Sequence, residues 1–161
     1  MASDEEDFDF NSEFSDEENE EFERERKAKD KKLKTHPLYI QANEVLHILE
    51  LLMETSADDD VKESFTSMMW DSATIIIAKL SSVLNSGFYI SCMQQAAIIR
   101  DHAEYLRLSN HMLTSIEAFD PKYITLFRDE MEKFRELFKA WAKEIHQMDD
   151  EIEDEWGLFT K

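Results

Sequence analysis

Apolar residues at alternating spacings of three and four over residues 124–148 constrain the fold of this chain more than any other feature of its sequence. The eight members of this series are Ile124, Phe127, Met131, Phe134, Phe138, Trp141, Ile145 and Met148. Such spacings place successive side chains on one face of an α-helix, which turns once in about 3.6 residues. The series therefore predicts a helix that packs along its whole length. Asp120 as N-cap and Pro121 as first helical residue mark its start.

Apolar residues at spacings of three and four also recur in three earlier segments, residues 38–52, 65–83 and 89–113. Helices of about 20 to 30 residues joined by short connections run antiparallel to their neighbours in sequence. We therefore predict an all-α fold. Residues 36–161 are expected to form an antiparallel up-down-up-down four-helix bundle domain that ends in a short acidic and aromatic tail.

The composition excludes several other classes. Only two Gly and two Pro occur in 161 residues, too few for the frequent turns of a β-sandwich or a dinucleotide-binding α/β fold. The single cysteine cannot form an internal disulfide and suits a reducing compartment. The N-terminal sequence lacks the basic and apolar regions of a signal peptide, and no apolar run approaches the ~20 residues of a membrane span. We expect a cytoplasmic protein with no membrane partner.

The N-terminal segment carries the densest charge. Residues 1–26 hold thirteen Asp or Glu and two Arg, with four Phe scattered among the acids, and residues 27–35 then turn basic. Such a composition buries too little apolar surface to offset ordering entropy, so we predict that residues 1–35 are a disordered tail, acidic and then basic. This tail either solubilises the protein or docks its Phe side chains into a basic, apolar groove. The basic run folds back on the acidic body or touches RNA weakly.

No pattern of catalytic or metal-ligating residues stands out. Glu44 and His47 match the Glu-x-x-His spacing of di-iron bundles once, without the second copy that such sites need, and both lie off the apolar stripe. Cys92 falls on the inner stripe of its helix, where a free cysteine behaves as a small apolar residue. There is no glycine-rich phosphate loop. We therefore expect no enzyme, and no catalytic, cofactor-binding or metal-binding residues.

Two cations interrupt apolar stretches and form a candidate polar site. Lys79 follows Ile75-Ile76-Ile77-Ala78, Arg100 follows Ala96-Ala97-Ile98-Ile99, and Glu104 lies one turn beyond Arg100. Both cations are expected at the boundary of the core, where charges are seldom left unpaired. Either they form structural ion pairs, or they hold an anion of a ligand or partner.

The C-terminal end supplies candidate partner contacts. Six of the seven residues 149–155 are acidic, and Trp156, Gly157, Leu158 and Phe159 follow them. An exposed apolar group at a terminus is a liability for a soluble protein. One interpretation is that Trp156 and Phe159 fold back on the bundle, with Gly157 making the bend. The other is that Trp156, Leu158 and Phe159 form a short motif that binds a partner.

Four motifs resemble a family of uncharacterised bacterial helical-bundle proteins best known from Bacteroidetes. They are His36-Pro37-Leu38-Tyr39, Ala96-Ala97-Ile98-Ile99-Arg100, Phe134-Arg135-Glu136-Leu137-Phe138 and Trp156-Gly157-Leu158-Phe159. This resemblance covers residues 36–161 and implies a helical bundle without an assigned activity. A looser likeness, in helix number and connections, is to bundle proteins encoded in ribosomal-RNA intervening sequences, which implies an association with ribosomes or RNA. The chain lacks their Asn-Ile-Ala-Glu-Gly-type stretch.

These features together predict a non-enzymatic, cytoplasmic protein–protein interaction module. Its partner is another protein, of an identity that the sequence does not specify, or a second copy of the chain. A net charge of −19 makes direct binding of nucleic acid unfavourable. The alternative is a ribosome- or RNA-associated accessory protein, which contacts RNA through residues 27–34 or basic ribosomal proteins through its acidic surface.

Overall fold

A computed structural model of the chain describes residues 16–56, 59–150 and 152–160, and these contain five α-helices and no strand. The helices are α1 (Asp16–Thr35), α2 (Pro37–Glu54), α3 (Asp59–Val83), α4 (Tyr89–Leu113) and α5 (Pro121–His146). The predicted all-α class is confirmed for this part of the chain.

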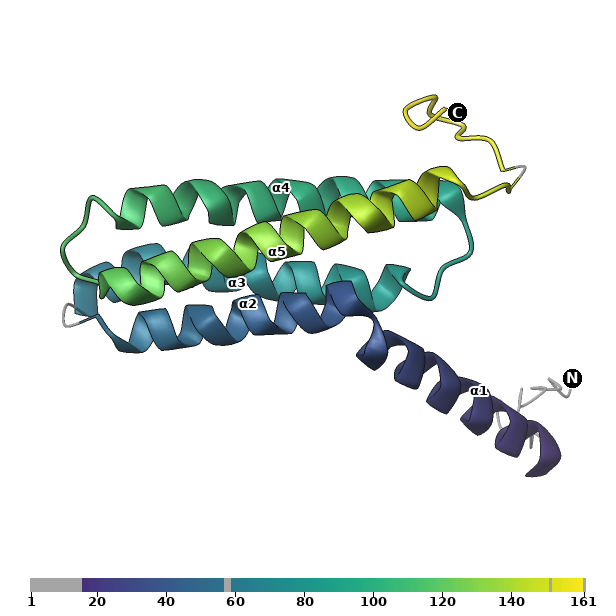
Figure 1. The fold of residues 1–161 in the computed structure, drawn as a ribbon. Helices are drawn as coiled ribbons and strands as arrows, with labels where there is room; N and C mark the ends of the chain where they lie inside the picture. Colours follow the sequence, from purple (N-terminus) through teal and green to yellow (C-terminus); the bar gives the residue numbers. More distant parts are fainter. Residues whose placement is uncertain (1–15, 57–58, 151, 161) are drawn as a thin grey trace, which may run out of the picture.

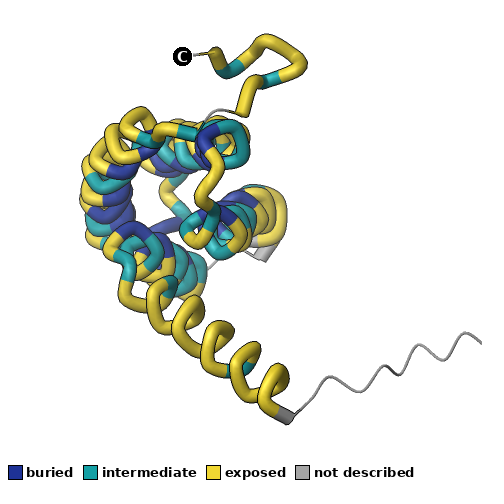
Figure 2. The backbone as a smooth tube through the Cα atoms, turned by 90° about the vertical axis from the view of Figure 1, so that its right-hand side faces the viewer, coloured by how far each residue is buried: buried dark blue, intermediate teal, exposed yellow. Residues whose placement is uncertain are grey.

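Helices α2 to α5 lie side by side, and consecutive helices run in opposite directions (Figure 1). Each packs against its neighbour in sequence, and α5 also packs against α2, so that the four helices form a closed ring. Seen end on, their buried residues turn toward the centre of this ring, and α1 points away from it (Figure 2).

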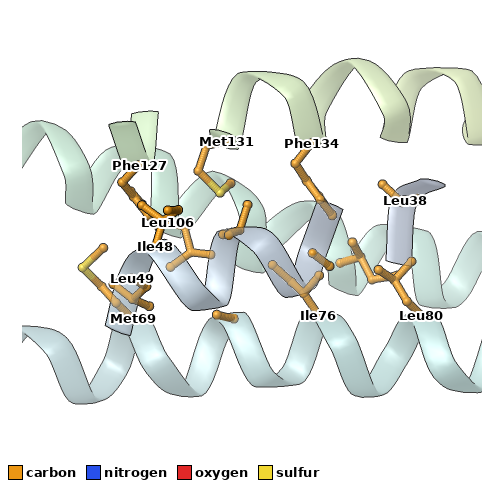
Figure 3. Close-up of a cluster of buried hydrophobic side chains, with 14 of the residues drawn as sticks. Leu38, Ile48, Leu49, Met69, Ile76, Leu80, Leu106, Phe127, Met131 and Phe134 are labelled. Atoms are coloured by element: carbon orange, nitrogen blue, oxygen red, sulfur yellow. The ribbon is translucent and has the colours of Figure 1, made fainter. Parts of the chain in front are cut away.

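The core consists of the apolar stripes that the spacing predicted. Six of the eight members of the series in residues 124–148 are buried, and the other two, Phe138 and Met148, are half-buried against the core. Figure 3 shows Phe127, Met131 and Phe134 of α5 with core residues of the other three helices. Burial of this kind contributes about 1.5–3 kcal/mol for each large apolar side chain.

Two proline-led helices have side-chain caps at their starts. Nδ1 of His36 accepts a hydrogen bond from the backbone N–H of Leu38 at 3.2 Å, directly before α2. Burial lowers the pKa of His36, which favours the neutral ring that this bond requires. Oδ1 of Asp120 accepts from the N–H of Lys122 at 2.9 Å, as predicted for the start of α5.

A buried polar network joins α2 to α5. Glu130, which is 6% exposed, accepts hydrogen bonds from Nε2 of Gln41 at 2.7 Å and from Nζ of Lys133 at 2.6 Å. The same Gln41 nitrogen donates to the backbone carbonyl of Glu130 at 3.1 Å. Burial acts to raise the pKa of Glu130, but the hydrogen bonds from Lys133 and Gln41 outweigh it and lower the pKa.

Helix α1 differs from the disorder expected for residues 1–35. Residues 16–35 form a helix whose side chains are almost all exposed. Pairs of opposite charge lie one turn apart along it, including Arg24–Glu20 at 3.0 Å and Lys34–Asp30 at 2.7 Å. Glu, Lys, Arg and Ala also have high helix propensity. Charge density alone therefore led to the wrong expectation for residues 16–35, while residues 1–15 lie outside the described part.

We predict that Glu130→Gln lowers the free energy of unfolding at pH 7 by about 1–3 kcal/mol, because the buried network loses its charged acceptor. The pKa of Glu130 lies below its ordinary value of 4.5 in the folded chain. This stabilisation is therefore complete above pH 4.5 and is lost as the pH falls through the folded pKa.

Urea unfolding of the wild type and of Glu130→Gln across this pH range measures the difference. Glu136→Gln, on the exposed side of the same helix, is the matched control and should have little effect. A difference between wild type and Glu130→Gln that stays constant from neutral to strongly acidic pH would contradict the assignment.

Candidate functional site: a C-terminal loop and an α4–α5 groove

The chain beyond α5 is fastened to the start of α4. The N-cap of α4, Phe88, has no side chain able to accept a hydrogen bond, and Oδ2 of Asp150 takes this role by accepting from the N–H of Tyr89 at 2.8 Å. A carboxylate at this position also faces the positive end of the helix dipole. The C-terminal residues therefore begin from a fixed point on the bundle.

Asp154 organises the loop of residues 152–160, which we call the C-terminal loop. Its carboxylate accepts hydrogen bonds from the backbone N–H groups of Trp156 at 3.1 Å, Leu158 at 2.8 Å and Phe159 at 2.8 Å. The bond from Phe159, followed by those from Trp156 and Leu158, lowers the pKa of Asp154. Gly157 has φ +66°, a backbone conformation that other residues rarely adopt, and makes the bend predicted there.

This loop separates the three predicted partner contacts. Phe159 is half-buried and packs against the core. Trp156 is 90% exposed and Leu158 is 74% exposed. Phe159 therefore packs against the bundle, in line with the interpretation that the terminus folds back. Trp156 and Leu158 instead point into solvent, as the interpretation of a partner-binding motif requires. The loop combines an anchored aromatic residue with two presented apolar ones.

A second surface feature runs between α4 and α5, and we call it the α4–α5 groove. It consists of two adjoining hollows of about 270 and 250 Å³, which share Arg107 and Met131 as lining residues. Its apolar lining is formed by Ala103, Met131, Phe134 and Phe138. Five cations also line it, namely Arg100, Arg107, Arg128, Arg135 and Lys139.

Carboxylates order some of these cations. Arg107 lies 2.7 Å from Glu104 and 3.2 Å from Glu132, and Arg135 lies 2.7 Å from Glu132. Glu104 and Glu132 are the two acidic residues among those lining the groove. Cations therefore outnumber acids here, the reverse of the whole chain, which has 18 basic and 37 acidic residues.

A buried amide completes the lining. Asn110 is 2% exposed, and its Oδ1 has no hydrogen-bond partner among the described residues. Asn110 lines the hollow that also contains His111 and Arg128. A buried acceptor without a donor costs free energy, so a group that supplies an N–H here is favoured.

The predicted polar site is divided between two places. Arg100 and Glu104 line the groove, but Arg100 is well exposed and lies 3.5 Å from Asp101, whereas Glu104 pairs with Arg107. Lys79 is half-buried on α3, outside the groove lining, and the ion pairs found in the described part of the chain do not include it. The expected placement of both cations at the core boundary therefore does not hold for Arg100, which lies about 100° around the helix from buried Ile99.

The residues weighed in the sequence as metal ligands or as a nucleophile lie on the surface or in the apolar core. Glu44 and His47 are exposed, and His47 lies 3.6 Å from Glu50. Cys92 is a buried free thiol. Across residues 16–56, 59–150 and 152–160, no three metal-ligating side chains gather to form a metal site. The described helices also include none with the length and apolarity needed to cross a membrane.

Comparison of the chain with models of known protein families gave no match, and comparison with curated proteins gave none either. The resemblance to a Bacteroidetes family therefore stays a prediction.

We predict that Asp154→Ala unfastens the C-terminal loop without unfolding the helices, because its carboxylate is the acceptor for three loop N–H groups. The amides of Trp156, Leu158 and Phe159 should exchange with solvent about tenfold faster or more, while core amides keep their protection. Hydrogen exchange followed by NMR measures both, with Asp149→Ala as the matched control. Unchanged exchange at Leu158 and Phe159 would show that other contacts hold the loop.

Proposed function

We propose that this chain is a non-enzymatic, cytoplasmic interaction protein whose helices α2–α5 form an antiparallel up-down-up-down four-helix bundle. In this proposal the bundle presents the C-terminal loop to a different protein. The observation that carries it is the exposure of Trp156 and Leu158 on a loop held by three hydrogen bonds to Asp154.

Several physical arguments support this role for the loop. Tryptophan is among the residues that most often dominate binding energy at protein interfaces. A loop that is already ordered loses less conformational freedom on binding than a flexible tail does. The acidic residues around Trp156, Glu153 and Glu155 among them, favour a partner with an apolar pocket and a basic rim.

The non-enzymatic part of the proposal rests on the candidate nucleophile and the candidate ligands. Burial raises the pKa of the Cys92 thiol, which disfavours the reactive thiolate. Glu44 and His47 face solvent rather than the bundle interior, where di-iron ligands lie.

Affinity purification from the native host with a tagged chain tests the proposed role, as a comparison of wild type with the double variant Trp156→Ala/Leu158→Ala. We expect one protein partner that survives nuclease treatment and whose recovery falls about tenfold or more in the double variant. Leu108→Ala, which removes an apolar side chain exposed on α4, is the matched control and should retain the partner.

Equal recovery with wild type and the double variant would contradict the role of the C-terminal loop. The alternative, an accessory protein of ribosomes or RNA, draws support from α1, which exposes Lys27, Lys31 and Lys32 outside the ion pairs found along this described helix. Ribosomal proteins that disappear from the same purification on nuclease treatment would favour that alternative.

A further inference from the structure

We propose that the α4–α5 groove binds residues 1–15 of a second copy of this chain, so that the protein associates with itself. This contact uses a surface other than the C-terminal loop and does not depend on the function proposed above.

The chemistry of the groove matches that of the segment. Residues 1–15 contain six acidic residues and no Lys or Arg, together with Phe8, Phe10 and Phe14. The groove offers five cations and an apolar lining that includes Phe134 and Phe138. Aromatic side chains that pack against one another gain attraction beyond that of the area they bury. The carboxylates of the segment and the cations of the groove then face each other across a partly desolvated contact.

The cations farthest from the groove's own carboxylates are the ones available to a ligand. Arg107 and Arg135 are already held by Glu104 and Glu132 at 2.7 to 3.2 Å. Arg100 and Arg128 have longer contacts, 3.5 and 3.8 Å, with the adjacent residues Asp101 and Asp129, and all four of these side chains are at least half exposed. Such weak surface pairs exchange readily for carboxylates of an incoming chain.

Asn110 provides a specific polar contact in the same groove. Its buried Oδ1 lacks a hydrogen-bond donor among the described residues. A peptide supplies backbone N–H groups at regular intervals along its length. One of them satisfies this acceptor when the segment lies in the groove.

The segment comes from a second copy because of where α1 points. Helix α1 has 20 residues, about 30 Å, and leads away from its own bundle (Figures 1 and 2). Phe8, the most distant of the three phenylalanines, precedes Asp16 by eight residues, or about 28 Å of extended chain. Folded back along α1, this length returns only to the junction of α1 with α2. The groove lies between α4 and α5, on a different side of the ring.

Sedimentation of the full chain over a wide range of concentrations tests this proposal. We expect wild type to form dimers whose dissociation constant rises about tenfold or more in each of two variants. The tail variant is Phe8→Ala/Phe10→Ala/Phe14→Ala, and the groove variant is Arg100→Glu/Arg128→Glu. Phe22→Ala on α1 and Lys122→Glu/Lys143→Glu outside the groove lining are the matched controls and should dimerise like wild type.

Mixing the two variants separates this contact from others. The tail variant keeps an intact groove and the groove variant keeps an intact segment, so a mixture restores one of the two contacts and forms a mixed dimer. A wild type that stays monomeric at the highest concentration would overturn the proposal. So would variants that dimerise normally, or a mixture that stays monomeric, which would show that the segment does not bind the groove of another copy. Loss of dimers in Trp156→Ala/Leu158→Ala would instead assign the groove to the C-terminal loop and would equally overturn it. Circular dichroism checks that each variant folds.

Discussion

Burial of the apolar face of α5 is the interaction on which the rest of the structure depends. This helix packs against both α2 and α4, and so closes the ring of helices. Glu130, on the same helix, joins α2 through Gln41. Helix α5 also supplies Phe138, Arg135 and Lys139 to the groove. Because the C-terminal loop follows α5 directly, both candidate surfaces are placed by the packing of this one helix.

The parts of the fold that follow from local periodicity could be predicted from the sequence. The series at 124–148 and the cap at Asp120 both specify backbone geometry over a few residues, and neighbouring structure agrees with them. Helix α1 could not be predicted from charge content, because helix propensity and ion pairs one turn apart act against disorder. Weighing the Glu–Arg and Asp–Lys spacings in residues 16–35 would have indicated this helix.

The candidate surfaces were predictable only in part, for a geometric reason. Ile99 is buried, whereas the next residue, Arg100, is exposed. A small rotation of a helix therefore decides which of several acidic side chains a cation contacts. The long arginine side chain of Arg107 reaches Glu132 on α5, a contact that no spacing in the sequence encodes. The role of Asp154 is easier to predict from the sequence. Asp side chains in turns commonly accept hydrogen bonds from backbone N–H groups about two residues later in the chain, and Gly157 allows the bend here.

The net charge of −19 restricts how this protein can meet any partner, including itself. In physiological salt, ions screen the repulsion between two copies of the chain, so it is weak at separations beyond about 8 Å. The repulsion becomes stronger as the two copies approach more closely. Association therefore requires a local surface where the sign of the charge is reversed and where apolar area is buried as well. Salt weakens the attraction between carboxylates and arginines in such a contact, but it also screens the overall repulsion. In the contact proposed for the groove, burial of phenylalanine contributes to the strength of association independently of this balance, and the charges of the groove contribute both to that strength and to the place where the acidic segment binds.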